Sequence, residues 1–452
     1  MPNIDFSSIK PLPGGTAPRL FIETYGCQMN VNDSEVVLSI MQEAGWRLCD
    51  KLDEADLILV NTCSVRESAE TRVMGRLDLF LQHKKGHGAI VGVLGCMAER
   101  MKEELLAHPA VDLVAGPDSY RDLPRLAASL SDGDKQINTL LSSEETYADI
   151  APVRMDKGGI SAFISIMRGC NNFCTYCIVP FVRGRERSRD KASILAEARA
   201  LAEAGYKEIN LLGQNVDSYR GDDGTGFAAL LDEVASAFPG IRIRFATSHP
   251  KDMCDDVLHV MAAHENICKH IHLPVQSGST AMLQRMNRHY SREEYLARVA
   301  KIREMMPECA ITTDIIAGFC GETLEEHLQT ISLMEEVRFD GAFMFQYSER
   351  PGTLAAKHFA DDVPTAEKIR RLNEIIALQN RISLEKNSAL VDSVVRVLIE
   401  GPSKRSASEL CGRGSDNRTC VFPACGYKAG EMAEVRIKSC TSATLKGEIN
   451  LA

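Results

Sequence analysis

The chain has no long uninterrupted apolar run, no secretory signal pattern and no excess of basic residues. Its apolar stretches are too short to span a bilayer, and its N-terminus lacks a basic segment followed by an apolar one. The net charge of −10 argues against a protein that wraps nucleic acid with its whole surface. We therefore expect a cytoplasmic protein that makes no membrane contact.

The composition is otherwise that of a folded globular protein, with 44% hydrophobic and 25% charged residues. A chain of 452 residues is longer than a single hydrophobic core usually supports, so we expect two or three domains. In a reducing compartment, the 15 cysteines favour metal binding and buried thiols over disulfides. Their odd number leaves at least one thiol unpaired.

Three cysteines lie within eight residues, Cys170, Cys174 and Cys177, directly after the apolar run 162–167. Three thiolates at this C-x3-C-x2-C spacing can hold one [4Fe–4S] cubane and leave its fourth iron open to an outside ligand. A structural zinc site needs four ligands, and no fourth Cys or His stands nearby. The motif predicts an iron–sulfur cluster; a zinc loop or three buried thiols are the alternatives.

Strand–helix alternation begins after a loose leader at 1–17 and predicts a small α/β domain with a mostly parallel sheet. The predicted strands are 20–25, 56–61 and 89–94, and the predicted helices are 33–44 and 67–81. Cys27, Cys63 and Cys96 each follow one of these strands, at the edge where ligands bind in open α/β sheets. They form either a second thiolate cluster or three unrelated buried thiols. Cys49 follows no strand, and we interpret it as a core or surface residue without a role in the site.

The polar stretch 131–158 is predicted to be a linker, and a second alternation begins near Ile160. Its predicted strands are 162–167, 207–212, 241–246, 270–274, 310–316 and 341–346, with helices at 191–204, 227–237, 292–306 and 323–337. Six strand–helix units fit a closed or partly open parallel barrel, whose chemistry collects at the carboxyl ends of the strands. The first strand delivers the cysteine loop to that rim.

Polar loops follow the other strands at the same rim. The candidate cofactor-binding residues there are Gln214, Asn215, Ser248 and Gln276. Glycines in the segment 313–322 offer a turn where the backbone can approach a ligand closely. Each loop alone is ordinary, but together they share one end of one barrel with the cysteines.

Four arginines occur within seven residues at 183–189, directly after the cysteine loop. A solvated charged face is the ordinary interpretation of such a segment. Its place beside the cysteines favours contacts to phosphate or to a cofactor carboxylate, which suit the planar fork of arginine. We assign Arg187 to cofactor binding.

The alternation stops at Ile382, and the remaining residues predict a small β-barrel. Strands are expected at 391–399, 419–422 and 434–437, with turns at 401–402, 412–417 and 426. From Asp392 onward, nine Lys/Arg stand against seven Asp/Glu, whereas the preceding residues carry the net negative charge. Seven of these basic residues are expected to decorate the barrel: Arg396, Lys404, Arg405, Arg413, Arg418, Arg436 and Lys438. Small barrels often bind RNA through such charges and through aromatic stacking by residues like Phe422 and Tyr427, although a core position is favoured for Phe422.

Nearly everything after the leader resembles the methylthiotransferase family of radical S-adenosylmethionine (SAM) enzymes. The matching segments are 24–30 (TYGCQMN), 32–35 (NDSE), 61–67 (NTCSVRE), 95–98 (GCMA), the cysteine loop, the arginine segment, 272–279 (HLPVQSGS) and 347–353 (YSERPGT). The C-terminal part resembles the TRAM domain, which holds tRNA in such enzymes. The resemblance implies an N-terminal Rossmann-like methylthiotransferase domain at 18–135, a partial (β/α)6 radical SAM barrel at 156–385 and a TRAM β-barrel at 386–450.

The resemblance also implies a reaction, in which a methylthio group replaces hydrogen at C2 of N6-isopentenyladenosine at position 37 of tRNA. Cys27, Cys63 and Cys96 would hold an auxiliary [4Fe–4S] cluster, and the cysteine loop would hold the cluster that cleaves SAM to methionine and a 5′-deoxyadenosyl radical. A second SAM would methylate the sulfur carried by the auxiliary cluster. An aromatic C–H bond needs such an oxidant, which cofactors supply and side chains do not.

The expected partners are a tRNA anticodon stem-loop carrying isopentenyladenosine and a flavodoxin-like or ferredoxin-like electron donor. We expect the protein to be a monomer. Same-chemistry rivals are methylthiolation of threonylcarbamoyladenosine in tRNA or of an aspartate in ribosomal protein S12; the segments 28–30 and 347–353 favour the isopentenyl branch. A non-catalytic iron–sulfur protein that binds RNA or carries electrons is the alternative from another class, and the SAM-type rim loops count against it.

One position departs from the family, which usually has proline where this chain has Cys320. Without proline φ is freer and an N–H is restored, so the local turn is expected to differ. A thiol near the SAM site could ligate iron, but we favour a packed side chain. The other cysteines without a motif are interpreted as structural: Cys254, Cys268, Cys309, Cys411, Cys420, Cys425 and Cys440.

Overall fold

A computed structural model describes residues 17–64, 67–130, 135–155 and 159–450. The chain divides into two compact units: one contains residues 1–157, 167–171 and 177–189, and the other contains 158–166, 172–176 and 190–452. Most of the leader, Val65 and Arg66 of the second motif, and residues 131–134 and 156–158 of the linker lie outside the described residues. No helix in the described ranges is both long enough and apolar enough to cross a membrane.

The first unit is built on a parallel sheet of six strands in the order β2-β1-β3-β4-β5-β6. The strands are β1 (Arg19–Tyr25), β2 (Arg47–Leu48), β3 (Leu57–Thr62), β4 (Ile90–Gly95), β5 (Leu113–Ala115) and β6 (Gln136–Asn138). The predictions at 20–25, 56–61 and 89–94 are confirmed as β1, β3 and β4. Strands β2, β5 and β6 were not predicted because two or three residues are too few to show a periodic pattern.

Helices cover both faces of this sheet. They are α1 (Gln28–Glu43), α2 (Glu67–His87), α3 (Cys96–Met101), α4 (Glu103–Leu106) and α5 (Leu123–Ala128), with 3-10 turns η2 (Leu52–Glu54) and η3 (Tyr120–Asp122). Side chains of β3 alternate between the faces: Leu57 and Leu59 pack in the core that α1 covers, and Ile58 and Val60 in the core that α2 covers. The short elements β8 (Met167–Arg168), α6 (Val179–Val182) and β9 (Arg187–Ser188) also belong to this unit.

The second unit contains the strand–helix barrel. Its strands β7 (Ser161–Ser165), β10 (Glu208–Leu212) and β11 (Arg242–Ala246) form one parallel sheet, and β12 (His270–His272), β13 (Ala310–Ala317) and β14 (Gly341–Gln346) form another. A parallel bridge between Ile243 and Ile267 links the two sheets. The helices are α7 (Lys191–Glu203), α8 (Phe227–Ala237), α9 (Asp255–Ala263), α10 (Thr280–Arg285), α11 (Arg292–Met305), α12 (Leu324–Val337) and α13 (Leu354–His358), with the turn η4 (Val216–Ser218). All six predicted strands and all four predicted helices are present.

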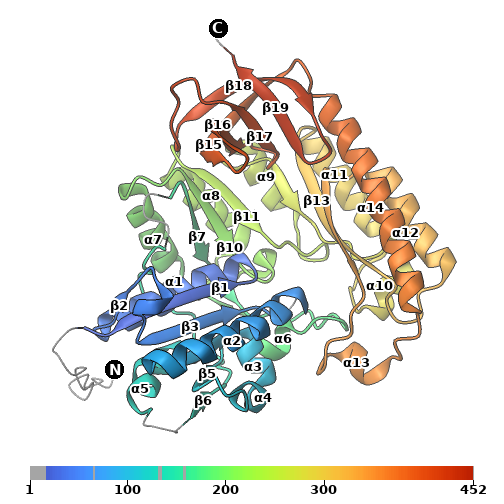
Figure 1. Ribbon diagram of the computed structural model, residues 1–452. Coiled ribbons are helices and arrows are strands. Elements are labelled where there is room, and N and C mark those ends of the chain that lie inside the picture. Colours follow the sequence, from blue (N-terminus) through green and yellow to red (C-terminus); the bar gives the residue numbers. More distant parts are fainter. Residues whose placement is uncertain (1–16, 65–66, 131–134, 156–158, 451–452) are drawn as a thin grey trace. The chain divides into compact units, whose positions relative to one another are not determined.

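The long helix α14 (Thr365–Ser388) was not predicted, and the alternation continues past the expected end at 382. Ile375, Leu378 and Ile382 are buried at helical spacing along it. The helix packs beside α12 and extends to the C-terminal barrel (Figure 1). Its apolar residues recur with the 3.6-residue period of a helix, a pattern that we did not interpret.

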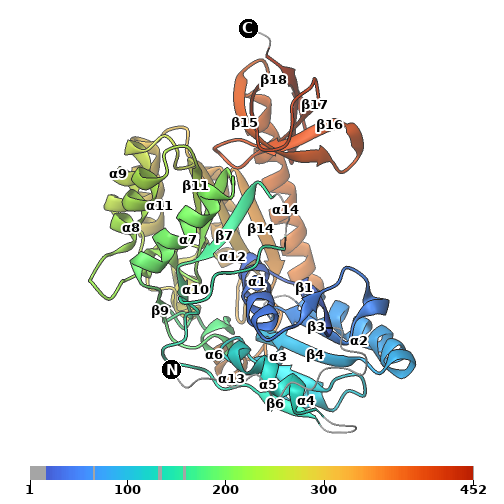
Figure 2. The same cartoon turned by 90° about the vertical axis from the view of Figure 1, so that its left-hand side faces the viewer.

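Five strands close the C-terminal barrel in the order β15-β16-β17-β19-β18 (Figure 2). They are β15 (Val394–Ser403), β16 (Ser406–Arg413), β17 (Thr419–Pro423), β18 (Met432–Cys440) and β19 (Thr444–Ile449). The turn predicted at Gly401 and Pro402 is wrong, because both residues lie within β15. The pairing register shifts on either side of them, and such a bulge accommodates a proline that cannot donate to the ladder.

A buried carboxylate joins this barrel to the strand–helix barrel within the second unit. Glu208 of β10 accepts hydrogen bonds from Arg244 of β11 at 2.7 Å and from Arg413 of β16 at 3.1 Å. Arg244 also donates to the Gly414 carbonyl at 2.6 Å. Burial opposes ionisation, but the two arginines outweigh it and lower the pKa of the Glu208 carboxyl below its ordinary value.

Replacing Glu208 with glutamine is expected to loosen this junction, because the buried Arg244 loses its counter-charge and Arg413 keeps only Glu400. Breaking a buried pair costs about 3–5 kcal/mol, so the melting temperature should fall and amide exchange at 410–418 should accelerate. Since the native pKa is lowered, this stabilisation is fully present above the ordinary glutamate pKa of 4.5 and is lost as the pH falls from there through the lower native pKa. The control Glu448→Gln removes an exposed ion pair with Lys438 and should change little. Equal behaviour of the two variants would contradict this role.

Candidate functional site

Three cysteines gather at the carboxyl edge of the sheet in the first unit. Cys27 precedes α1 and follows β1 by two residues, Cys63 directly follows β3, and Cys96 directly follows β4 as the first residue of α3. Strands β1, β3 and β4 are neighbours in the sheet. The structure therefore places three cysteines that are more than thirty residues apart in the sequence at one edge of the sheet. That they share one cluster stays a prediction.

Local contacts fix the loops that carry these cysteines. Gly26 has φ of +131°, and a Cβ there would lie 2.4 Å from the Cys63 Cβ, so only glycine allows the two loops to meet. The buried amides of Asn30 and Asn61 tie the loops together: Asn30 donates to the Asn61 side chain at 3.1 Å, and Asn61 donates to the Asn30 carbonyl at 3.0 Å. Both asparagines belong to motifs that carried the family resemblance.

The three thiols interact with one another and with one arginine. A hydrogen bond with Cys63, assisted by the charge of Arg183, lowers the pKa of the Cys27 thiol to about 6. Burial raises the pKa of Cys96, and the nearby Arg183 opposes that effect. The Nε of Arg183 donates to the Cys96 Sγ at 3.2 Å. The positive charge of Arg183 therefore acts on Cys27 and Cys96 in the direction of the thiolate, the form that binds metal.

Arg183 belongs to a buried network of arginines and aspartates. Asp33 accepts from Arg168 and from Arg183, each at 2.7 Å, and its side chain is fully buried. Burial opposes ionisation of Asp33, but the two arginines outweigh it and lower the pKa of the carboxyl. Asp118 accepts from Arg187 at 2.9 Å and lies 3.7 Å from Arg168.

These contacts correct the interpretation of the segment 183–189. Arg183, Arg187 and Arg189 are buried, so the segment is not a solvated charged face. Arg187 donates to Asp118 and to the Ser142 and Arg183 carbonyls, so the protein itself engages the guanidinium that we assigned to a cofactor. Sequence reasoning missed this network because its partners lie up to 150 residues apart.

Close backbone contacts hold the start of the cysteine loop. Within the first unit, β8 pairs antiparallel with β9, and the Cys170 N–H donates to the Gly184 carbonyl at 3.2 Å. Gly169 has φ of +78°, and a Cβ there would lie 2.0 Å from the Arg185 carbonyl oxygen. This glycine is therefore required by the approach of two backbone segments.

Cys174 is held within the second unit by the segment that follows α10. Asn287 donates to the Asn172 and Phe173 carbonyls, and the Thr175 N–H donates to the Met286 carbonyl at 3.0 Å. The Nη1 of the buried Arg288 donates to the Cys174 Sγ at 3.3 Å. Sequence reasoning missed Arg288, whose neighbours 285–290 had no recognised motif.

The predicted rim residues lie after the strands as expected. Gln214 and Asn215 follow β10, Ser248 follows β11, and Gln276 follows β12. Asn215 donates to Asp252 at 2.7 Å, while the side-chain carbonyl oxygens of Gln214 and Asn215 are buried without a hydrogen-bond partner among the described residues. Such orphaned acceptors fit a ligand that carries N–H or O–H donors.

The segment 313–322 differs from its prediction. A Cβ on Gly318 would lie 2.4 Å from the Lys368 side chain, and one on Gly321 would lie 2.6 Å from Arg285, so these glycines allow protein packing. Cys320 is buried in a core cluster with Phe319 and Tyr347, which confirms a packed side chain.

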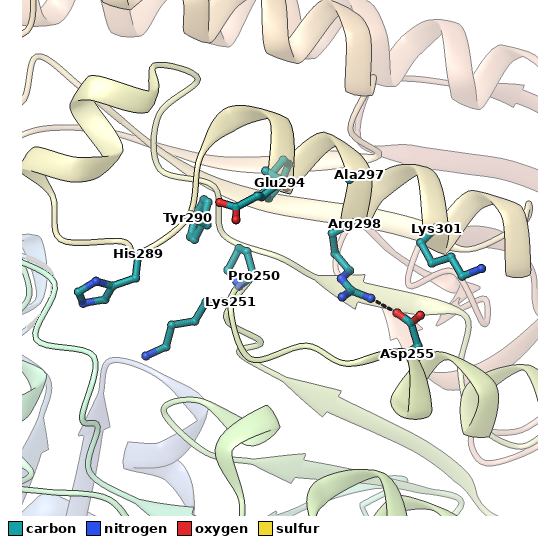
Figure 3. Close-up of a pocket in the computed structure, with 10 residues that line it drawn as sticks. Pro250, Lys251, Asp255, His289, Tyr290, Glu294, Ala297, Arg298 and Lys301 are labelled. Atoms are coloured by element: carbon teal, nitrogen blue, oxygen red, sulfur yellow. Dashed lines mark hydrogen bonds and ion pairs between the residues drawn. The ribbon is translucent and has the colours of Figure 1, made fainter.

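A pocket of about 470 Å³ lies beside this rim, between the loop after β11 and helix α11 (Figure 3). Lys251, Arg298 and Lys301 bring positive charge to it, but Arg298 pairs with Asp255. None of the four predicted rim residues lines this pocket. The pocket is lined by side chains of both charge signs, so its lining does not indicate a particular kind of ligand.

The zinc alternative for the cysteines is not supported. In the described part of the chain, no three Cys, His, Asp or Glu side chains converge closely enough to hold a single metal ion. A cubane binds each cysteine to a different iron, so its ligands need not converge on one point.

Comparison with known proteins assigns the family. Residues 19–116 match the family described as uncharacterized protein family UPF0004, residues 164–334 match the radical SAM superfamily, and residues 389–449 match the TRAM domain. A protein of Bacteroides fragilis named tRNA-2-methylthio-N(6)-dimethylallyladenosine synthase is 57% identical over 436 residues, 95% of each chain. Its namesake from Porphyromonas gingivalis is 55% identical over 438 residues, again 95% of each chain. The chain belongs to this methylthiotransferase family.

Solved structures at low sequence identity share the fold of this chain. The radical SAM methyltransferase TsrM from Kitasatospora setae superposes with a TM-score of 0.59 at 15% identity over 75% of each chain. The cobalamin-dependent radical SAM enzyme OxsB superposes with a TM-score of 0.53 at 15% identity, over 80% of this chain and 56% of its own. The family match also removes the non-catalytic alternative, because the homologues are enzymes.

Replacing Asp33 with asparagine tests the buried network of this methylthiotransferase. The change keeps the shape but removes the charge between two buried guanidinium groups, so we expect a loss of about 3–5 kcal/mol. Thermal unfolding monitored by circular dichroism should show a lower midpoint than for the exposed-site control Asp50→Asn. An unchanged midpoint would show that the arginines do not depend on Asp33.

Proposed function

We propose that the chain transfers a methylthio group to C2 of N6-isopentenyladenosine at position 37 of tRNA, giving 2-methylthio-N6-isopentenyladenosine. The observation that carries the proposal is the cysteine triad at the sheet edge of a chain that also has a radical SAM loop. Relatives that are 55–57% identical over nearly their whole length bear the name of this activity. The motifs at 28–30 and 347–353 favour the isopentenyl substrate.

Each cysteine set is assigned one [4Fe–4S] cluster. Cys170, Cys174 and Cys177 would hold the cluster that binds SAM, and Cys27, Cys63 and Cys96 would hold the auxiliary cluster. The lowered pKa of Cys27 and the arginine donor on Cys96 support thiolate ligands at the second set. When bound, the clusters and SAM supply the radical oxidant and the sulfur that side chains cannot supply.

The protein's own residues would position these groups. The Asn30–Asn61 amide pair fixes the spacing of the loops that carry Cys27 and Cys63. The orphaned amide oxygens of Gln214 and Asn215 support SAM contacts at the rim, where Ser248 and Gln276 would complete the set. Arg187 is left out of this set because Asp118 already binds it.

We assign the work to three domains: 18–135 carries the auxiliary cluster, 156–385 generates the radical and 386–450 binds tRNA. Of the seven basic residues predicted to bind RNA, Arg413, Arg418 and Arg436 make contacts within the protein. Lys404 and Arg405 are exposed between β15 and β16 and are the best candidates for phosphate contacts. Phe422 is a core residue, and Tyr427 packs against the same core. A flavodoxin-like or ferredoxin-like donor and a monomeric state complete the proposal.

Cysteine variants separate the two clusters functionally. Reconstituted Cys96→Ala, given SAM, dithionite and isopentenylated tRNA, should still form 5′-deoxyadenosine but no methylthio nucleoside. Cys174→Ala should form neither product, and Cys254→Ala, at an exposed position without a motif, should form both. Liquid chromatography with mass spectrometry measures both products. Methylthio product from Cys96→Ala would contradict the role of the first triad.

Removing two charges from the TRAM barrel tests the tRNA contacts. If Lys404 and Arg405 each neutralise one phosphate, Lys404→Ala/Arg405→Ala should reduce the slope of log Kd against log salt concentration by roughly one to two. Fluorescence anisotropy with labelled tRNA measures the slope. The control Arg199→Ala/Arg381→Ala removes two exposed charges elsewhere and should leave the slope unchanged. Equal slopes for both double variants would show that Lys404 and Arg405 do not contact the tRNA phosphates.

A further inference from the structure

Arg288 is a buried cation without an acidic partner. The side chain is 4% exposed, and its Nε donates to the Tyr290 hydroxyl at 3.0 Å. Its Nη2 donates to the Pro274 carbonyl at 2.6 Å, and its Nη1 donates to the Cys174 Sγ at 3.3 Å. No carboxylate among the described residues lies within ion-pair distance of it. A buried charge without a counter-charge costs several kcal/mol, so this position demands an anion.

Arg288 hydrogen-bonds one cysteine among the described residues, Cys174, whose sulfur is a thiolate when it ligates iron. Its other hydrogen-bonding neighbours are the phenols of Tyr176 and Tyr290 and a backbone carbonyl. Burial and Arg288 act on Tyr290 in opposite senses, and the pKa of that phenol is raised overall, so it stays neutral. Burial and the charge of Arg288 also lower the pKa of the neighbouring His249, which keeps that ring uncharged.

A second buried excess of positive charge faces Cys96 in the first unit. Among the described residues, Arg168, Arg183 and Arg187 pair with two carboxylates, those of Asp33 and Asp118, so these five side chains carry one net positive charge. Arg183 is 3% exposed, and its Nε donates to the Cys96 Sγ at 3.2 Å. The same arrangement therefore occurs in both units, on unrelated elements of the chain.

The net negative charge of a three-cysteine [4Fe–4S] cluster can neutralise the buried positive charge in each unit. An oxidised [4Fe–4S] core carries two positive charges, and three thiolates carry three negative ones, so a three-cysteine cluster has one net negative charge. One added electron doubles that negative charge. A buried cation that hydrogen-bonds a ligand sulfur therefore stabilises the reduced cluster more than the oxidised one, and hydrogen bonds to the sulfurs set the reduction potential.

We propose that Arg288 and Arg183 are the counter-charges of the two clusters, each donating one hydrogen bond to a ligand sulfur and raising the reduction potential of its cluster. They are positioning and tuning residues, distinct from the cysteine ligands. The inference rests on the proposed assignment of the two cysteine sets. The redox step involves one electron from a chemical reductant such as dithionite to the cluster, with no bond made or broken.

The first test measures the potential of each cluster in isolation. Arg288→Gln is made in a chain whose Cys27, Cys63 and Cys96 are alanine, and the reconstituted protein is titrated with dithionite under electron paramagnetic resonance. At a fixed solution potential the ratio of reduced to oxidised cluster should fall about tenfold, equivalent to about 59 mV for one electron. Arg183→Gln is tested in the same way with Cys170, Cys174 and Cys177 replaced by alanine.

Two further variants keep the test decisive. Arg288→Lys retains the charge but not the guanidinium fork, so its potential should lie between those of wild type and Arg288→Gln. Arg285→Gln removes a nearby arginine that donates to the Cys320 carbonyl, and it should leave the potential unchanged. If Arg288→Gln binds less iron, Arg288→Lys should restore the iron content. Full iron with an unchanged potential in Arg288→Gln would overturn the inference.

Failure of the inference is separable from failure of the proposed function. If wild-type protein does not methylthiolate isopentenylated tRNA, the substrate assignment is wrong, yet the potentials still respond to the arginines. If the potentials do not respond while wild type makes the product, the arginines serve packing alone.

Discussion

The carboxylate of Asp33 is the group on which the first unit most depends. It lies at the N-terminal half of α1, in the opening motif, and accepts from Arg168 before the cysteine loop and from Arg183 after it. Three segments that are distant in the sequence therefore meet at one buried charge. Without that carboxylate, Arg183 would be buried with no ion-pair partner among the described residues, and Arg168 would keep only Asp118 at 3.7 Å, a condition that proteins avoid.

The same network links folding to chemistry. Arg183 divides its donors between Asp33 and the Cys96 sulfur, so the contact that holds the segment 183–189 in place also orients a cysteine. Arg288 repeats this division in the second unit, between a carbonyl, a phenol and the Cys174 sulfur. In the C-terminal barrel, Arg413 pairs with Glu208, so the tRNA contacts that we propose fall to Lys404 and Arg405, nearer the hairpin tip.

Much of this could be predicted from the sequence, because the signals were local. The alternating strands and the cysteines that follow β1, β3 and β4 were evident from pattern alone, and so was the open-iron spacing at 170–177. The buried arginines could not be found this way, since a charge-rich segment has the same composition whether it faces water or an aspartate 150 residues away. Gly318 and Gly321 were misjudged for a similar reason: a glycine shows that something approaches closely, but not whether it is a ligand or a helix. Helix α14 was missed because its apolar 3.6-residue pattern was not interpreted.

The central claim is that this chain methylthiolates isopentenyladenosine in tRNA. Mass spectrometry of nucleosides from total tRNA of a strain lacking the gene tests it most directly. The account predicts loss of 2-methylthio-N6-isopentenyladenosine, accumulation of N6-isopentenyladenosine, and restoration by the wild-type gene but not by Cys96→Ala. Unchanged methylthio-isopentenyladenosine, or loss of the methylthio group from threonylcarbamoyladenosine instead, would contradict it.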